Sequence, residues 1–419
     1  MSGMATADHD GEILFLAHRI PFPPDRGDKI RSHHLLKALA QIAPVHVGTF
    51  GETAADMAAK AELAEIAASH RLLERRKPLS LAGVEAIATG KPVSLTAFHA
   101  HAMRDWIEQV LTERNIGTIF VFSGQMGQYI PDDFTGRVVV DLCDVDSAKF
   151  EAYGAQITGP RSVIDRREGK LLAIEEERIA NRADTTLLIT DTEAQLFRSR
   201  LTDSETPDIR TIRNGIDAAL FDPAKVVAHT GLMSGDPHIV FTGQMDYPPN
   251  VAAALRVMDR ILPPIRARHP DATFHVVGRA PVEELTVRNG KDGICVWGEV
   301  PDVKPFLKAA DIVIAPLEIA RGIQNKVLEA MAMARPVLLS TEAATGIDAT
   351  DGAHFAVGSD DLRLVELALR LLDNPALAHS MGEAARDYVL AQQSWPAILA
   401  PLADIVCGTR AQRQSALVA

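Results

Sequence analysis

The chain has 419 residues, a formal net charge of −12 at pH 7 and three cysteines. A hydrophobic core stops growing at roughly 250 to 300 residues, so this length predicts two domains. The acidic balance argues against general nucleic-acid binding, and cysteines that lie far apart predict neither a zinc site nor a disulfide framework, so we expect a soluble cytoplasmic protein.

The two ends of the sequence are expected to lie outside the folded domains. Residues 1–11 are polar and acidic and lack the basic start and apolar run of a signal peptide, so we expect a disordered lead there. Residues 408–419 are expected to form a loose tail. No apolar run approaches the roughly 20 residues that a membrane span needs, so any membrane contact is expected to be peripheral.

The first half of the sequence alternates short apolar strands with helices. The expected strands are residues 13–17, 45–50, 118–122, 137–141 and 185–190, and the expected helices are 30–41, 54–69, 101–114, 165–182 and 192–201. This rhythm predicts a parallel sheet. Because each strand is continuously apolar, we expect helices on both faces of that sheet.

A second set of strands begins after Arg213, where Asn214-Gly215 is a turn signal. Its expected strands are residues 238–242, 273–277, 294–297, 311–315, 337–340 and 354–357, again alternating with helices. After a helix near 375–391, Pro396 breaks the run, and a last helix could return to the first domain. We therefore expect a first domain of residues 12–213 joined by a helix at 395–407, and a second domain of residues 214–394.

The most informative motif is RGIQNKVLEAMA, residues 321–332, which places charged side chains in an otherwise apolar helix. It follows the strand 311–315 and so opens a helix at a strand's carboxyl end, where free N–H groups and the helix dipole favour phosphorylated ligands. Lys326 adds a full positive charge. Glu329 is flanked by apolar residues, and a partly buried carboxylate needs donors such as ribose hydroxyls. The alternative is a salt bridge between Lys326 and Glu329 at i, i+3.

Three more strands of the second domain end in a glycine and a short polar turn. These turns are Gly243-Gln244, Gly278-Arg279 and Gly298 to Val300. Several such loops on one sheet edge are stronger evidence for a ligand site than any single loop. Asn250, a little further along the first of them, is interpreted as the N-cap of the following helix.

In the first domain, the first strand leads into a proline-stiffened loop that contains Gly27, Asp28 and Arg31. This loop resembles a phosphate or acceptor loop, although it is neither a Walker A motif nor a GxGxxG fingerprint. The alternative is a plain tight turn at Gly27 and a solvated helix charge at Arg31.

Asp141, Asp144 and Asp146 crowd the end of another first-domain strand. They indicate acid–base work or sugar recognition. In the alternative interpretation, Asp146 or Ser147 caps the next helix and Asp141 binds backbone amides.

Two further clusters are less specific. His99 and His101 are two residues apart and share no helix face, so no metal site is expected. The basic run of Arg71, Arg75, Arg76 and Lys77 indicates a solvated face or, alternatively, a surface for anionic lipid or a pyrophosphate-linked acceptor.

Taken together, these motifs resemble the retaining glycosyltransferases of family 4, the group 1 sugar transferases of GT-B architecture. The resemblance covers residues 12–406 and is carried by RNGID, FTGQMDYPPN, FHVVGRAP, VWGEVPDVKPFLKAADIVIAPL and NKVLEAMAMARPVLLS. The segments LAHRIPFPPDRGDKIRSHHLLKALA, VVDLCDVDSAKFEAY and RGIQNKVLEAMAM are similar to the bacterial branch found beside exosortase/PEP-CTERM exopolysaccharide systems.

The resemblance implies an α/β fold of two Rossmann-like parallel-sheet domains facing across a cleft. It also implies that the second domain binds the donor, with Glu329 on the ribose hydroxyls, residues 298–300 near the base and the helix opening near the diphosphate. The expected donor contacts therefore comprise the following residues: Gly243, Gln244, Gly278, Arg279, Gly298, Val300, Gly322, Ile323, Gln324, Asn325 and Glu329.

The sequence departs from the family pattern at three places. Arg321 stands where a glutamate is usual, and Gln244 begins a stretch where an Arg and a Lys usually follow the glycine. We infer that Lys326, with Arg321, supplies the missing charge for the diphosphate. Ser123 and Asp144 lie near the level where the first domain often has a histidine, and Asp144 is the candidate for catalytic contact there.

The implied reaction is hexosyl transfer from a nucleotide sugar to a lipid-linked or polysaccharide acceptor with anomeric retention, in exopolysaccharide biosynthesis at the inner face of the membrane. No metal and no cofactor beyond the donor are expected. The alternatives are a nucleotide-sugar epimerase or a sugar phosphorylase of the same fold, and a catalytically weak donor-binding scaffold in a polysaccharide assembly complex.

Overall fold

A computed structural model of the chain describes residues 11–156, 158–202, 207–232, 236–320 and 322–408. The expected lead at 1–11 and tail at 408–419 therefore lie almost entirely outside the described residues. The chain divides into two compact units, the first comprising the chain up to Asn214 and from Ile398, the second running from Gly215 to Ala397.

The first unit is built on a seven-stranded parallel sheet of order β3-β2-β1-β4-β5-β6-β7. Its strands are β1 (Glu12–Ala17), β2 (Val45–Gly51), β3 (Ser69–Glu74), β4 (Ile116–Phe122), β5 (Arg137–Cys143), β6 (Thr185–Leu188) and β7 (Ile209–Thr211). Apart from Glu12 and Gly117, every residue of the central strands β1 and β4 is buried, as their continuous apolar sequences predict.

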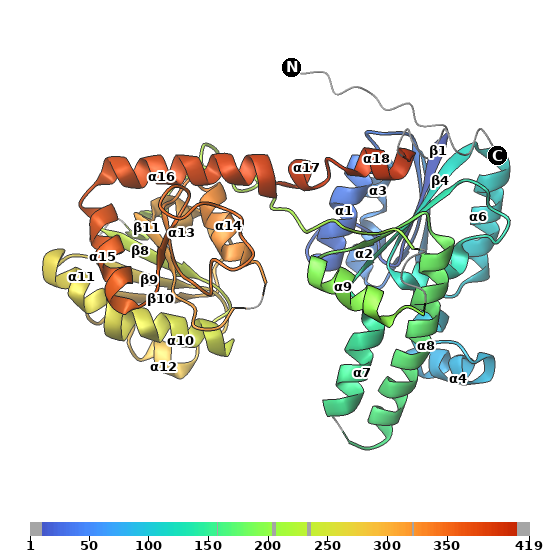
Figure 1. Ribbon diagram of the computed structural model, residues 1–419, viewed down its shortest axis with the longest axis horizontal. Coiled ribbons are helices and arrows are strands. Elements are labelled where there is room, and N and C mark those ends of the chain that lie inside the picture. The colour runs from blue at the N-terminus through green and yellow to red at the C-terminus, as the bar shows by residue number, and fades with distance from the viewer. Residues whose placement is uncertain (1–10, 157, 203–206, 233–235, 321, 409–419) are drawn as a thin grey trace. The chain divides into compact units, whose positions relative to one another are not determined.

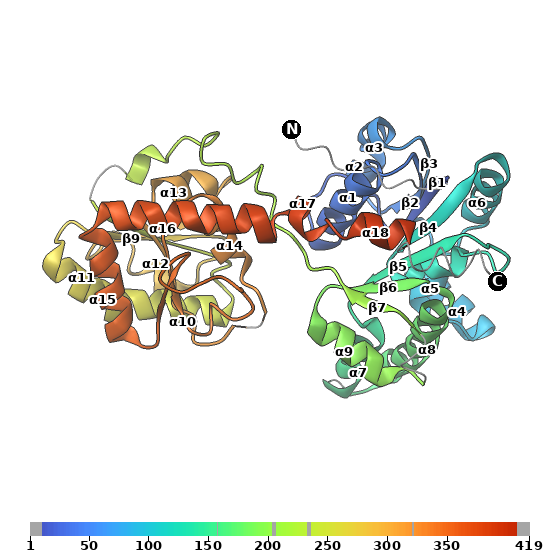
Figure 2. The same ribbon diagram turned by 45° about the horizontal axis from the view of Figure 1, so that its top comes forward.

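Helices cover both faces of this sheet, with α1 and α6 on opposite sides of β1 (Figures 1 and 2). They are α1 (Gly27–Leu39), α2 (Ala54–Ala58), α3 (Lys60–Ile66), α4 (Leu79–Thr89), α5 (Val93–Ala97), α6 (His101–Glu113), η1 (Gly124–Tyr129), α7 (Asp146–Gln156), α8 (Pro160–Arg182) and α9 (Asp191–Arg200). The single helix expected at 54–69 is instead two helices followed by the edge strand β3.

The second unit has a six-stranded parallel sheet of order β10-β9-β8-β11-β12-β13. Its strands are β8 (His238–Thr242), β9 (Thr273–Val277), β10 (Ile294–Gly298), β11 (Ile312–Ala315), β12 (Val337–Ser340) and β13 (Ala356–Gly358). The helical segments are η2 (Thr230–Leu232), α10 (Pro248–Arg256), η3 (Val257–Ile261), α11 (Leu262–Arg268), α12 (Glu283–Thr286), α13 (Lys304–Ala309), α14 (Asn325–Ala332), α15 (Asp361–Leu372), α16 (Pro375–Tyr388) and η4 (Val389–Gln393).

The chain passes twice from one unit to the other. Within the second unit the two passages pair, since the Ile216 N–H donates to the Gln393 carbonyl at 2.7 Å and the Trp395 N–H donates to the Ile216 carbonyl at 3.2 Å. After α17 (Trp395–Ile398), the helix α18 (Leu402–Cys407) packs on the first unit, where the Thr118 hydroxyl donates to the Val406 carbonyl at 3.1 Å.

Candidate functional site

The strand order of the second sheet reverses between the neighbours β8 and β11. The strands β9 and β10 follow on one side of this pair, and β12 and β13 follow on the other. In an open parallel sheet, ligands bind outside the carboxyl ends of the strands at such a switch point. The chain leaves β8 toward α10 and leaves β11 toward α14. Residues from the starts of these two helices can therefore meet at the switch point.

Lys326, the second residue of α14, makes this connection. Its Nζ donates to Asn250 Oδ1 on α10 at 2.5 Å and lies 4.8 Å from the centre of the Phe241 ring. Burial lowers the pKa of Lys326 to about 8, although Glu329 opposes the shift. The ammonium is therefore a half-buried charge that is held by an amide and an aromatic face.

Asn250 is not the N-cap that its sequence context predicts. The helix α10 begins two residues earlier at Pro248, and Tyr247 precedes it as the N-cap. Asn250 is buried, and its Nδ2 donates to the Gln244 carbonyl at 2.8 Å while its Oδ1 accepts from Lys326. It thus joins the loop after β8 to the helix after β11.

Glu329 lies one turn further along α14 and is half-buried. Its carboxylate makes no hydrogen bond or ion pair with any residue in the described ranges, so the salt bridge considered for Lys326 and Glu329 is absent. Burial raises the pKa of Glu329, while Lys326 and Lys304 act in the opposite direction. A partly desolvated acceptor without a protein donor suits a ligand hydroxyl.

Gly243 and Gly278 let the ends of β8 and β9 approach closely. A Cβ on Gly278 would lie 1.6 Å from the Gly243 carbonyl oxygen, and Gly278 has φ +153°. The Gly278 N–H donates to the Gly298 carbonyl at 2.9 Å. Side-chain-free backbone therefore lines this part of the edge, as the glycine pattern predicts.

The opening of α14 offers backbone donors. Gln324 precedes the helix as N-cap without a side-chain capping bond, and its Nε2 donates to the Gly322 carbonyl at 3.1 Å. Ile323 is half-buried and Asn325 is exposed. Arg321 lies outside the described residues, so its expected role in the diphosphate clamp stays a prediction.

The remaining donor candidates lie at the same edge. Arg279 Nη2 donates to Gln244 Oε1 at 2.9 Å, and both side chains are exposed, whereas Val300 is half-buried after β10. The second-unit residues selected from the sequence and described in the structure thus come together at one end of one sheet. Their contact with a ligand stays a prediction.

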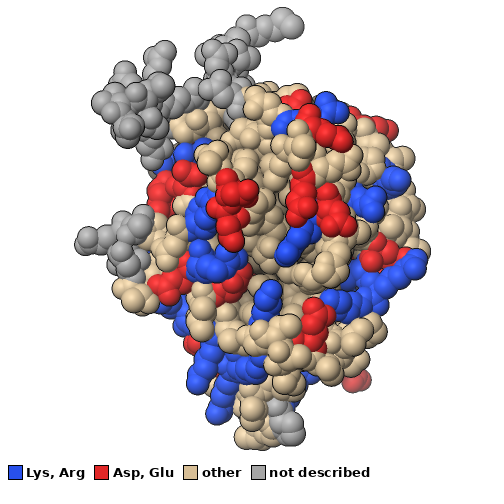
Figure 3. Space-filling model, turned by 90° about the vertical axis from the view of Figure 1, so that its right-hand side faces the viewer, with Lys and Arg blue, Asp and Glu red and all other residues tan. Residues whose placement is uncertain are grey.

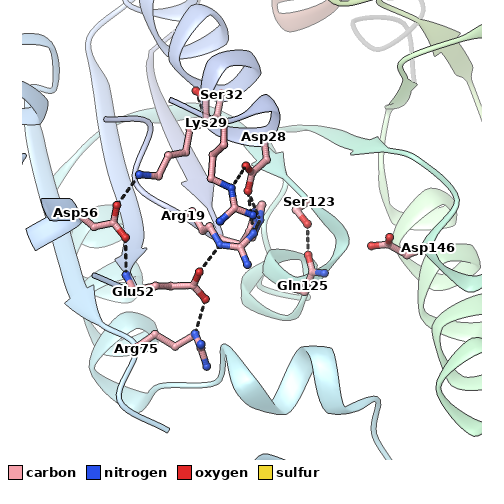
Figure 4. A network of polar contacts seen from close by, with 12 residues as sticks. Arg19, Asp28, Lys29, Ser32, Glu52, Asp56, Arg75, Ser123, Gln125 and Asp146 are labelled. Atoms are coloured by element: carbon pink, nitrogen blue, oxygen red, sulfur yellow. Dashed lines mark hydrogen bonds and ion pairs between the residues drawn. The ribbon is translucent and has the colours of Figure 1, made fainter. Parts of the chain in front are cut away.

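The first sheet has its own switch point at β1 and β4. There, Asp28 accepts from Arg19 at 2.8 Å, and Arg19 also pairs with Glu52 at 2.6 Å (Figure 4). Burial raises the pKa of Asp28, but its bonds with His18 and Arg19 outweigh this and hold that pKa well below the usual range. Gly27 is exposed as the first residue of α1.

Arg31 is buried, so the solvated-charge interpretation is wrong. Its Nε donates to Asp141 Oδ2 at 2.9 Å and its Nη1 donates to Asn214 Oδ1 at 3.0 Å. The guanidinium therefore connects α1 to β5 and to Asn214, the last residue of the first unit before the chain passes to the second. Asp141 also accepts from the Cys143 N–H at 3.0 Å, as the structural alternative predicts.

Asp144 and Ser123 follow β5 and β4 at the carboxyl edge. Asp144 is half-buried, its pKa is raised mainly by burial, and Lys149 Nζ lies 4.0 Å from it. Ser123 is buried and its hydroxyl donates to Gln125, as Figure 4 shows. Both residues stay candidates for acceptor or sugar contact.

Sequence reasoning missed Glu176, a buried carboxylate on α8. It accepts from the Ser147 N–H at 2.9 Å and from the Ser147 hydroxyl at 2.5 Å. Glu176 thus provides an acceptor for a backbone N–H in the first turn of α7, which has no acceptor within the helix. No local motif reveals it, because its partner is 29 residues away.

The basic run of Arg71, Arg75, Arg76 and Lys77, which begins within β3, is largely neutralised. Arg75 pairs with Glu52 at 2.6 Å, Arg76 with Glu74 at 2.5 Å and Lys77 with Glu85 at 2.8 Å; Arg71 is exposed. Throughout the described ranges, no three His, Cys, Asp or Glu side chains are grouped to hold a metal ion. No helix there combines the length and hydropathy that crossing a bilayer requires.

Residues 236–374 match the model of the family described as Glycosyl transferases group 1. The matched segment contains β8 to β13 and α14, and hence Asn250, Lys326 and Glu329. The match supports the group 1 resemblance for this part of the chain.

Two curated relatives are each 28% identical to the chain. One is the GDP-mannose-dependent monoacylated alpha-(1-6)-phosphatidylinositol monomannoside mannosyltransferase of Corynebacterium glutamicum, aligned over 45% of this chain and 53% of that protein. The other is the lipopolysaccharide core biosynthesis mannosyltransferase LpcC of Rhizobium leguminosarum bv. viciae, over 43% and 54%. The chain thus spans about half the length of the curated relatives it matches.

Solved structures confirm the expected fold class of two Rossmann-like parallel-sheet domains. HepE of Anabaena, in complex with UDP, superposes with a TM-score of 0.57 at 14% identity, over 97% of this chain and 100% of that one. Sucrose-phosphate synthase from Thermosynechococcus elongatus gives a TM-score of 0.55 at 16% identity, over 97% and 100%. At these identities the likeness speaks for the fold alone.

Proposed function

We propose that the chain is a glycosyltransferase whose second unit binds a nucleoside-diphosphate sugar and transfers the sugar, with anomeric retention, to a lipid-linked or polysaccharide acceptor. The observation that carries this is the pair of Lys326 and Glu329 at the switch point. The ammonium and the carboxylate lie one turn apart on α14 without pairing with each other. The group 1 family match over the same segment supports the proposal.

In this reaction the protein mainly positions the donor and stabilises the departing diphosphate. Glu329 accepts the ribose hydroxyls. Lys326 and the uncapped N–H groups at the start of α14 face the diphosphate, whose negative charge grows as the sugar leaves. No protein nucleophile and no metal ion are required.

The first donor to test is GDP-mannose, because both curated relatives are mannosyltransferases and one is named for that donor. The names of both relatives refer to lipid-containing glycans, which supports a lipid-linked acceptor. A role in exopolysaccharide assembly at the inner face of the membrane rests on the sequence resemblance alone.

Thermal-shift measurements with GDP-mannose and with UDP-, ADP- and TDP-sugars test donor binding, since a ligand that binds only the native state raises its apparent stability. Slow release of free sugar from the best donor, and the configuration of the first-formed product by NMR, test transfer and retention. Donor binding without any hydrolysis or transfer would point instead to a donor-binding scaffold. No shift with any nucleotide sugar would overturn the proposal.

A further inference from the structure

The helix α4 of the first unit turns an apolar face to the outside. Leu79, Leu81, Val84 and Ile87 each expose more than half of their surface. The only charged residue of α4 is Glu85, which is half-buried and accepts from Lys77 Nζ at 2.8 Å. The exposed face of α4 thus carries no charge, which is unusual for a surface helix.

The first half of α8 exposes positive charges only. Its two acidic residues, Asp165 and Glu168, are buried, and Glu168 accepts from the Val93 and Ser94 N–H groups at 2.7 and 2.8 Å. The exposed charged residues there are Arg161, Arg166 and Lys170, and the exposed apolar ones are Val163 and Ile164.

Arg167 brings these two helices together. Its Nη2 donates to the Ala86 carbonyl of α4 at 2.8 Å. Val163, Ile164 and Lys170 lie three or four residues from Arg167 and so share its side of α8. We name the exposed apolar residues of α4, together with the exposed apolar and cationic residues in the first half of α8, the α4/α8 surface: Leu79, Leu81, Val84, Ile87, Arg161, Val163, Ile164, Arg166 and Lys170.

The figures show how this surface stands out. In Figures 1 and 2, α4 lies beside α8, and the α7–α8 hairpin projects from the sheet. Figure 3 has the projecting end of the hairpin at the bottom, where tan and blue atoms predominate over red. The chain has a net charge of −12, so an anionic partner repels most of its surface and attracts this local cationic and apolar surface. The molecule is therefore expected to approach such a partner with this surface first.

We propose that the α4/α8 surface docks the first unit onto an anionic lipid bilayer. An uncharged apolar helix face can enter the interface between headgroups and acyl chains, while adjacent Arg and Lys side chains contact the phosphates. The docking itself does not depend on the proposed function. Only the consequence that the first unit meets a lipid-linked acceptor at this surface rests on that function.

Co-sedimentation of the full chain with vesicles tests the docking without any catalysis. Phosphatidylcholine vesicles containing phosphatidylglycerol should bind the protein, pure phosphatidylcholine vesicles should bind it at least about tenfold less, and added salt should weaken binding. The double variant Val84→Asn/Ile87→Asn and the double variant Arg166→Glu/Lys170→Glu should each lose about tenfold or more in partitioning.

The matched control is Val227→Asn/Leu362→Asn, which changes two apolar residues of the second unit that are even more exposed than Val84 and Ile87 and should bind vesicles like the wild type. Unchanged melting temperatures and donor-induced thermal shifts in all variants separate this test from that of donor binding. Equal binding to neutral vesicles, or wild-type binding by both surface variants, would overturn the proposal. So would a dimer, seen by light scattering, that the Val84→Asn/Ile87→Asn change dissolves, because a second copy would then cover the surface.

Discussion

Lys326 Nζ and Asn250 Oδ1 meet at 2.5 Å and join the helices that follow the two strands of the switch point. The same amide holds the loop after β8 through the Gln244 carbonyl. Asn250 therefore positions the ammonium relative to the loop that follows β8. We regard it as a positioning residue for the proposed reaction.

The kcat/KM for the donor should fall as the pH rises above about 8, because Lys326 loses its charge near that value in the free enzyme. Asn250→Asp places a carboxylate against the ammonium, so it should move this alkaline limb to higher pH while lowering kcat. Asn250→Ala should lower kcat by roughly tenfold without moving the alkaline limb of the pH profile to higher pH. A wild-type profile that stays flat to pH 9.5 would contradict the role of Lys326.

Lys326 and Glu329 should give different kinetic signatures. Lys326→Ala removes charge that matters most as the diphosphate departs, so kcat should fall by roughly 10²-fold or more. Glu329→Ala removes an acceptor for donor hydroxyls and should mainly raise the donor KM. Steady-state kinetics of the two variants, with circular dichroism to confirm folding, measure this split. A wild-type kcat and a wild-type donor KM in both variants would contradict the roles proposed for Lys326 and Glu329.

The regular part of the second sheet could be predicted from the sequence. The strands expected at 238–242 and 273–277 coincide with β8 and β9, since continuous apolar runs bounded by glycine leave little choice. The place of Asn250 inside α10 could not be predicted in this way. Pro248 and Pro249 fit the first turn of a helix, so α10 starts before Asn250, the residue expected to be its N-cap.

The first unit was harder to predict. The strand β3 is an edge strand with no buried residue, and its sequence SHRLLE lacks the apolar run that identifies a central strand. The fates of Arg31 and Glu176 depend on partners 110 and 29 residues away, which local patterns cannot reveal. Glycine spacing, by contrast, located the edge where the donor candidates gather.

Gly278→Ala should destabilise the second unit by at least about 2–4 kcal/mol, because the new Cβ would overlap the Gly243 carbonyl in addition to straining a positive φ. Gly298→Ala is the matched control, since Gly298 has φ +73° but open space for a Cβ, and should cost only about 1–2 kcal/mol. Urea denaturation compares them. Equal losses would show that close approach of the strand ends is unimportant.

Arg31→Met should cost about 3–5 kcal/mol of stability, because it leaves the buried Asp141 carboxylate without its cation. Adding Asp141→Leu should recover much of the loss, since both charges are then removed. The control Arg363→Met breaks the exposed pair with Glu366 and should change stability by less than about 1 kcal/mol. Arg31→Met with wild-type stability would argue for a ligand role instead.

Glu176→Gln should stabilise the protein at pH 8 and change it little at pH 5. Burial raises the pKa of Glu176 to about 7, although its bonds with Ser147 oppose the shift, whereas the ordinary value is 4.5. The folded state thus holds a proton more tightly than the unfolded state. This contribution to stability is full below pH 4.5 and is lost as the pH rises through about 7, on the order of 3–4 kcal/mol in total.

The glutamine oxygen can still accept from the Ser147 N–H, and the glutamine NH2 group can donate to the Ser147 hydroxyl. Glutamine carries no charge, so its burial has no cost of charge desolvation. The difference in melting temperature between Glu176→Gln and wild type should therefore grow from pH 5 to pH 8. Glu175→Gln, at a neighbouring position where Arg178 pairs with the carboxylate, is the control and should show no such growth. A difference that is constant with pH would mean that the wild-type carboxyl does not titrate in this range.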